Sequence, residues 1–87
     1  MTPLTQTIVT AAQLGLLLRS ARKSARLTQA QLASRLGLSQ TRVSELELAP
    51  GSLTVAQLLS VCAQLGLQLQ LAVREGDAPL SQPRANW

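Results

Sequence analysis

Hydrogen-bonding side chains are concentrated in the short sequence QTRVS, residues 40–44. A glutamine amide bonds adenine N6 and N7 in a bidentate way, and an arginine guanidinium does the same to guanine O6 and N7. A threonine contacts a thymine methyl group or donates to a base edge. The pattern therefore indicates direct contacts to DNA bases, made by Gln40, Thr41, Arg42 and Ser44.

Two short helices joined by a tight turn are expected to position these side chains. Thr28, with a glutamine three residues later, forms a capping box that begins the first helix, and Gly37 ends that helix in a left-handed conformation. Ser39 caps the second helix, on which Val43 and Leu46 face inward. The pattern predicts a helix-turn-helix whose second helix enters the DNA major groove. The alternative is an ordinary helical hairpin with a solvated polar face.

Positive charge is concentrated in the same half of the chain. Residues 1–44 contain six Lys and Arg residues and no Asp or Glu, whereas residues 45–87 contain two Arg and four acidic residues. A basic region that coincides with a helix-turn-helix indicates a polyanionic partner, and a solvated basic face is the alternative. We expect contacts to DNA phosphates from Lys23, Gln29 and Arg35, with Gln29 beside a helix N-terminus.

Two further helices are expected to flank the motif. Thr10 caps a helix over residues 11–25, and Thr54 caps another over residues 55–65 that a glycine ends. The inward positions expected on the latter helix are Leu58, Leu59, Cys62 and Leu65. Because Cys62 is the only cysteine, it forms no internal disulfide, and we expect it to be a small core residue.

Residues 67–74 change period and alternate between apolar and polar side chains, which predicts a strand. A single strand has no partner elsewhere in the chain except a weak β-like run near Ile8, and its backbone groups need one. The simplest solution is its own copy in a second subunit, giving an antiparallel two-stranded ribbon. A fifth helix is the alternative. The apolar residues of the expected ribbon are Leu67, Leu69, Leu71 and Val73.

The remaining features set boundaries within the chain. We expect an N-terminal arm over residues 1–9, a DNA-binding and dimerisation domain over residues 10–74, and a flexible tail over residues 75–87. The tail ends in Trp87, the only aromatic residue, and Trp is the residue most typical of interface hot spots. A chance terminal residue is the alternative.

Several classes of protein are excluded by what the chain lacks. With no His or Tyr, one Cys and no Asp before position 77, no acid–base pair or activated nucleophile can be assembled. We therefore expect no enzyme, no cofactor and no metal. No apolar segment approaches the roughly 20 residues that span a bilayer, and no basic n-region marks a signal peptide. We expect a cytoplasmic, nucleoid-associated protein without a membrane partner.

The motif resembles the helix-turn-helix of phage repressor and Cro-type regulators, the Xre class. The resemblance is carried by Gln-Leu-Ala, Leu-Gly-Leu-Ser, Val-Ser and Leu-Glu within residues 28–47. It implies a compact, mostly α fold that binds operator DNA as a dimer. By this resemblance Gln29 matches a phosphate-contacting glutamine. The positions that match base-contacting residues are Gln40, Thr41 and Ser44.

The same resemblance implies an ion pair between Arg22 and Glu47, which would tie the first helix to the recognition helix. Two separately solvated side chains are the alternative. Glu45 departs from the pattern, because several relatives carry an uncharged amide there. Ser39 also departs, since some relatives have a base-contacting Lys at that position; we count Ser39 among the expected base contacts, and Arg42 is expected to take over the missing charge.

Nearly the whole chain resembles the HipB-type antitoxins of bacterial HipA/HipB toxin–antitoxin modules. This resemblance is carried by Thr10–Leu18, Leu27-Thr28-Gln29, Leu32-Ala33, Gln40 with Val43-Ser44, Leu67–Val73 and Trp87. It implies a repressor-like domain of about four to five helices with one C-terminal strand in an intersubunit two-stranded ribbon. It also implies a homodimer that represses its own operon and neutralises a HipA-type serine/threonine kinase, with Trp87 docked on the toxin. A free-standing repressor without a toxin is the alternative.

Overall fold

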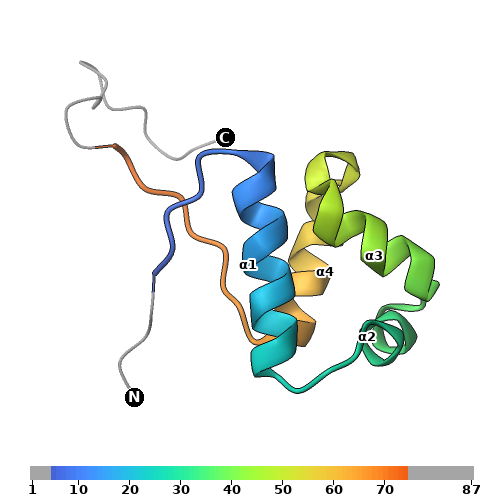
Figure 1. The fold of residues 1–87 in the computed structure, drawn as a ribbon. Coiled ribbons are helices and arrows are strands. Elements are labelled where there is room, and N and C mark those ends of the chain that lie inside the picture. The colour runs from blue at the N-terminus through green and yellow to red at the C-terminus, as the bar shows by residue number, and fades with distance from the viewer. Residues whose placement is uncertain (1–4, 75–87) are drawn as a thin grey trace.

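Four helices make up the part of the chain that the computed structural model describes, residues 5–74. Along the chain these are α1 (Ala11–Ser24), α2 (Gln29–Leu36), α3 (Gln40–Leu48) and α4 (Val55–Leu65), with a short 3-10 helix, η1 (Pro50–Ser52), before α4. The extended segments, residues 5–9 and 67–74, leave on the side of α1 away from α3 (Figure 1). The mostly α helix-turn-helix fold expected from the sequence is confirmed.

Local signals in the sequence set the helix ends. Three helices begin at a threonine hydroxyl that accepts from the backbone N–H three residues later, where a glutamine bonds back to the cap; these threonines are Thr10, Thr28 and Thr54. Ser39 caps α3 with its hydroxyl alone. Gly37 and Gly66 end α2 and α4 at φ 70°, a conformation that glycine adopts without strain.

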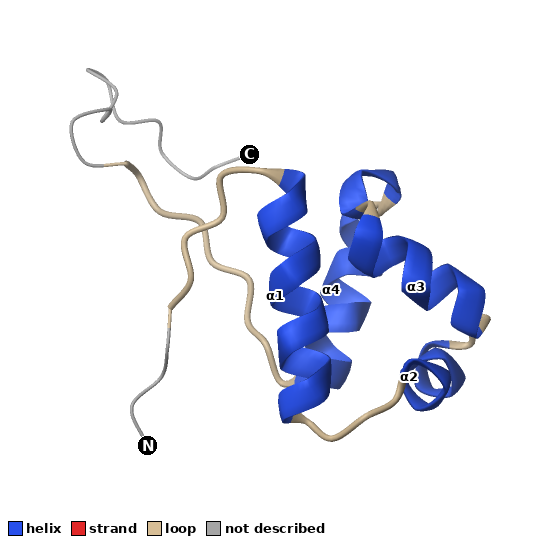
Figure 2. Cartoon of the chain, viewed as in Figure 1, coloured by secondary structure: helices blue, strands red, loops and turns tan. Residues whose placement is uncertain are grey.

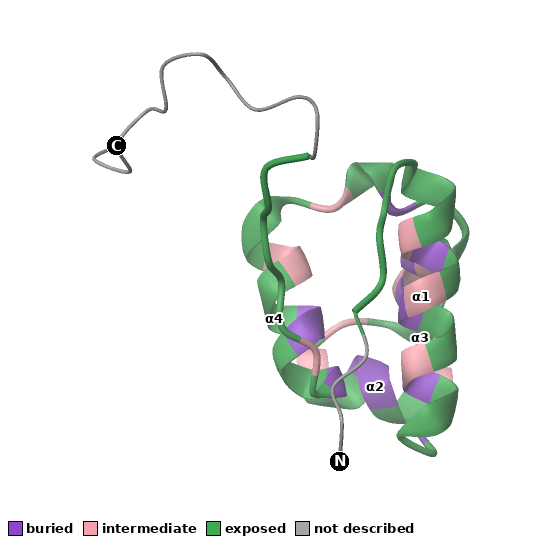
Figure 3. Ribbon diagram, turned by 90° about the vertical axis from the view of Figure 1, so that its left-hand side faces the viewer, coloured by how far each residue is buried: buried purple, intermediate pink, exposed green. Residues whose placement is uncertain are grey.

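The core is aliphatic and lies where the four helices meet, as the buried positions in Figure 3 show. Both helices of the helix-turn-helix contribute to it, because α2 buries Leu32 and Ala33 while α3 buries Val43 and Leu46. The small side chain of Ala33 lets the two helices approach closely. The other buried members of the cluster are Leu18, Leu27, Val61 and Leu65.

One inward position on α4 was predicted wrongly. Leu59 is 49% exposed, whereas Val61 is buried. The inward face of α4 follows the spacing i, i+3, i+4 and i+7, which is the spacing of a single helix face. Leu59 lies about a quarter of a turn off this face. The residues on the inward face are Leu58, Val61, Cys62 and Leu65.

The C-terminal segment after α4 forms neither a strand nor a helix within residues 67–74. Only helices and loops occur over residues 5–74 (Figure 2), so a fifth helix does not follow α4 there. Leu67 packs against the core, and beyond it the chain is extended and exposed, with Leu71 95% accessible. A strand needs a neighbouring strand to pair with, and residues 5–74 of one chain supply none to this segment. Among the described residues, no helix is long and apolar enough to cross a membrane.

Candidate nucleic-acid interface

The turn between α2 and α3 fixes the angle between the two helices. Gly37 donates its backbone N–H to the carbonyl of Ser34 over 3.3 Å, and Leu38 donates to the carbonyl of Ala33 over 2.9 Å. Leu38 is half-buried against the core. Ser39 then starts α3, because its Oγ accepts from the backbone N–H of Arg42 over 3.1 Å. This arrangement presents one face of α3 to the outside.

The outer face of α3 carries the side chains expected to read bases. Gln40 and Thr41 are exposed, whereas Arg42 and Ser44 are half-buried. Ser39 is exposed, and its hydroxyl serves as the helix cap. A capping hydroxyl uses a lone pair of its oxygen, so its own hydrogen remains available to donate. The structure therefore brings all five expected base-contacting residues to the first turns of one helix.

Arg42 lies between two acceptors. Its Nη1 donates to Oγ of Ser52 in η1 over 3.2 Å and lies 3.8 Å from Oε1 of Glu45 one turn along α3. Glu45, whose role the sequence left open, thus partly neutralises Arg42. Sequence reasoning missed Ser52, because nothing in its spacing from Arg42 indicates a contact.

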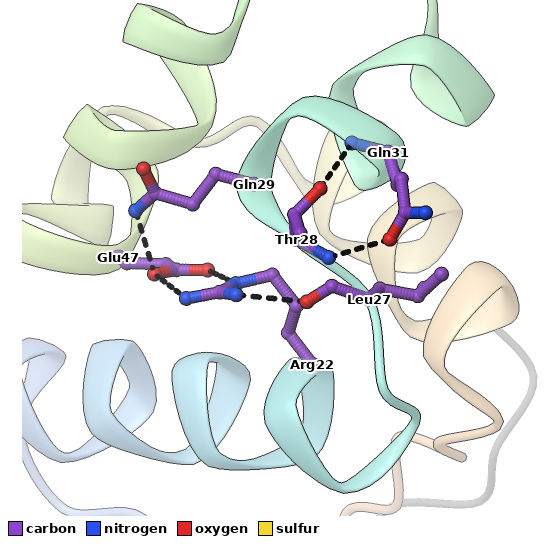
Figure 4. A network of polar contacts seen from close by, with 6 residues as sticks. All are labelled: Arg22, Leu27, Thr28, Gln29, Gln31 and Glu47. Carbon is purple, nitrogen blue, oxygen red and sulfur yellow. Dashed lines mark hydrogen bonds and ion pairs between the residues drawn. The ribbon is translucent and has the colours of Figure 1, made fainter.

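A polar network joins α1, α2 and α3 (Figure 4). Arg22 of α1 donates from Nε to Oε2 of Glu47 over 2.6 Å and from Nη2 to Oε1 over 3.2 Å. Its Nη1 donates to the carbonyl of Leu27 over 2.9 Å. Gln29 of α2 donates from Nε2 to Oε1 of Glu47 over 3.1 Å. Arg22 and Glu47 therefore form an ion pair, and Gln29 is bonded to it.

The expected phosphate-contacting cations lie on the surface at the ends of two helices. Lys23 is exposed in the last turn of α1, and Arg35 is exposed in the last turn of α2. Arg26 is also exposed and has a positive φ of 60°, a conformation that is uncommon for a residue other than glycine. Sequence reasoning gave Arg26 no role. No pattern in the sequence indicates that an arginine would take this conformation after the end of α1.

Cys62 is buried on α4, as expected. Burial raises the pKa of its thiol above the usual value, which keeps it protonated and unreactive at neutral pH. Over residues 5–74 no group of three or more His, Cys, Asp or Glu side chains is placed to hold a metal ion. Trp87 and the rest of the tail lie outside the described residues.

The fold and this surface define a helix-turn-helix protein, and comparison with protein families agrees. The helix-turn-helix family HTH_3 matches residues 18–71, which is more than half of the chain. The chain therefore belongs to this family. No curated protein matches it.

Solved structures of HipB are similar to this chain. One is a HipA–HipB–O2–O3 complex, at a TM-score of 0.70 and 26% identity, covering 78% of this chain and 96% of that one. Another is a HipB–O1–O2 complex, with the same TM-score and identity, covering 78% of this chain and 99% of that one. A HipB variant bound to an O2 20mer has a TM-score of 0.70 and 28% identity over 78% of this chain and 94% of that one. The protein is thus a HipB-like helix-turn-helix protein.

Proposed function

We propose that this protein binds operator DNA as a homodimer and represses its own operon, with α3 as the recognition helix. The observation that carries the proposal is the outer face of α3, where a capped helix presents Gln40, Thr41 and Arg42 together. The fold around it is similar at a TM-score of 0.70 to HipB in its O1–O2 complex. Ser39 and Ser44 add hydrogen-bonding groups at the same surface.

The contacts to the DNA backbone belong to Lys23, Gln29 and Arg35. Gln29 starts α2, where helix N-termini favour anions. Lys23 and Arg35 are exposed cations that a phosphate oxygen can reach. Such contacts position the protein on DNA without reading sequence.

The proposed dimer pairs residues 67–73 of two chains as an antiparallel ribbon. Leu69, Leu71 and Val73 are exposed in the single chain, and a second copy would cover them. The segment leaves the helices on the side away from α3 (Figure 1), so pairing there does not cover the recognition helix. A two-fold axis through the ribbon would place two recognition helices in successive major grooves.

The proposed protein partner is a HipA-type serine/threonine kinase toxin, which the dimer would neutralise. Support comes from the similarity to HipB in a HipA–HipB–O2–O3 complex. Trp87, in the tail beyond the described residues, is the proposed toxin contact. A free-standing repressor without a toxin is the second candidate.

A pull-down from the native host separates these two candidates. The full chain, a chain ending at Arg74 and a Trp87→Ala chain are each used as tagged bait. We expect the full chain to recover a kinase-like protein and the two altered chains to recover less of it. Equal recovery by all three would remove Trp87 from the interface. Recovery of DNA alone by all three would leave a free-standing repressor.

A further inference from the structure

Glu47 holds the side-chain amide of Gln29 in one orientation. Nε2 of Gln29 donates to Oε1 of Glu47 over 3.1 Å, and Figure 4 shows the amide oxygen turned away from the carboxylate. A carboxylate only accepts hydrogen bonds. The opposite orientation of the amide would therefore set two oxygens against each other. The charge of Glu47 thus decides which end of the Gln29 amide faces α3.

Arg22 holds this carboxylate in place and balances its charge. Two guanidinium nitrogens bond the two oxygens of Glu47, and the side chains of Arg22 and Glu47 are only 9% and 5% exposed. A bidentate bond of this kind fixes the rotamer of the carboxylate as well as its position. Because the pair is neutral as a whole, Glu47 can lie close to a polyanion without strong repulsion.

The start of α2 supplies further donors beside Gln29. The backbone N–H of Gln31 is bonded to Oγ1 of Thr28, whereas those of Gln29 and Ala30 form no hydrogen bond within the described residues. Such unpaired groups at a helix N-terminus point outward and favour an anion. The amide of Gln29 has two N–H groups, and its bond to Glu47 uses one of them.

We propose that Glu47 is a positioning residue for DNA binding. It orients Gln29 so that the second amide N–H joins the two backbone N–H groups at the start of α2 in binding one phosphate of the DNA backbone. The inference rests on the proposed DNA-binding function and adds a link between two helices. Because Glu47 belongs to α3 and Gln29 to α2, the phosphate contact of α2 is held in a fixed relation to the base-reading face of α3.

A double-mutant cycle on DNA affinity tests the proposal. Gln29→Ala should weaken binding about threefold to tenfold, equally on a selected operator and on random duplex, because a phosphate contact carries no sequence information. Glu47→Gln should weaken binding by a similar factor. In the Gln29→Ala background, Glu47→Gln should cause no further loss. If Glu47→Gln weakens DNA binding by the same factor with and without Gln29→Ala, the proposal is wrong. Glu47 would then act on the protein fold rather than through Gln29.

A second variant covers the case in which Glu47→Gln alone does not fold. Replacing both charges, with Arg22→Met and Glu47→Leu, avoids an unpaired buried charge, and apolar pairs of similar volume are often well tolerated at such positions. The double variant should lose as much DNA affinity as Gln29→Ala does. Adding Gln29→Ala to the double variant should cause no further loss. Unchanged affinity in the folded double variant would also overturn the proposal.

Gln57→Ala is the matched control. It removes one side-chain hydrogen bond from the capping box of α4 and leaves the network at Glu47 intact. Its DNA affinity should equal that of the unaltered chain, whatever stability it loses. If the unaltered chain binds neither operator nor random duplex, the proposed function itself is wrong. If the unaltered chain binds DNA but the effects of the two substitutions simply add, only the positioning role of Glu47 is wrong.

Discussion

Arg42 carries more hydrogen-bond donors than any other side chain of α3. In the single chain its guanidinium is shared between Ser52 and Glu45, at 3.2 and 3.8 Å. Both partners are surface groups, and an ion pair at such a site contributes little to stability. Moving the guanidinium from these partners to a guanine therefore costs little. Base recognition by Arg42 is compatible with the contacts that it makes in the free chain.

Replacing Arg42 with Ala should weaken binding to a selected operator by about 1–3 kcal/mol and relax specificity at one base pair. The loss arises because a bidentate contact to one base is removed. Affinities for the operator and for its single-base variants, measured at one salt concentration, check this expectation. Equal losses on operator and random duplex would rule out base reading by Arg42.

Arg35 should behave differently, because it is an exposed cation at the end of α2 that is expected to meet phosphate. Arg35→Ala should weaken binding to all sequences by a similar factor. It should also reduce the slope of log affinity against log salt by about one unit, since one fewer counterion is released. The measurement is a salt titration of operator and random duplex. An unchanged slope would place Arg35 away from the DNA.

At the scale of elements, α1 packs unusually closely on the end of α3 at Gly15. A Cβ added to Gly15 would overlap the backbone carbonyl oxygen of Glu47 and would lie 3.2 Å from Cδ of Pro50. Backbone atoms cannot move aside as a flexible side chain can. The glycine therefore lets α1 approach the end of α3 and η1, which brings Arg22 within reach of Glu47.

Gly15→Ala should accordingly lower the free energy of unfolding by about 1–3 kcal/mol, the usual cost of overpacking. Urea unfolding followed by circular dichroism measures the change. Gly51→Ala is the matched control, because a Cβ there would meet no atom within 4 Å, and it should alter stability little. Equal stability of the two variants would show that α1 shifts to accommodate the methyl group.

The difference between local signals and contacts of distant segments explains how much of the fold and the site could be predicted from the sequence. Helix ends depend on a few neighbouring residues, so Thr28 and Gly37 were sufficient to locate α2. The close contact at Gly15 and the bond from Arg42 to Ser52 depend on how distant segments meet, which local spacing does not specify. Leu59 was misplaced for a related reason, since two adjacent leucines leave the angle of the inward face open.

At the scale of the whole molecule, α3 and the extended C-terminal segment lie on opposite sides of α1 in the view of Figure 1. One side can therefore contact DNA while the other contacts a second chain. The small aliphatic core gives such association a further role. A domain of this size buries little apolar surface by itself, and a dimer interface would add to it.

Leu71→Glu tests this arrangement, because Leu71 is 95% exposed in the single chain. The change should leave the helical domain as stable as before when the chains are dilute and separate. In the proposed ribbon, each dimer would lose two buried leucines, which together contribute about 3–6 kcal/mol to the free energy of association. The affinity of the dimer should therefore fall by about a hundredfold or more. Sedimentation should show a monomer, and operator binding should weaken because two half-sites are no longer bound together.

Gln70→Glu is the matched control for Leu71→Glu. Successive side chains of a strand point to opposite faces, so the new carboxylate would lie on the polar face of the ribbon, and the chain should remain a dimer. If the Leu71→Glu chain forms dimers with an unchanged dimer affinity, the subunit interface lies elsewhere. The next surface to test would then be the outer face of α4, where Val55 and Leu59 are both exposed one turn apart.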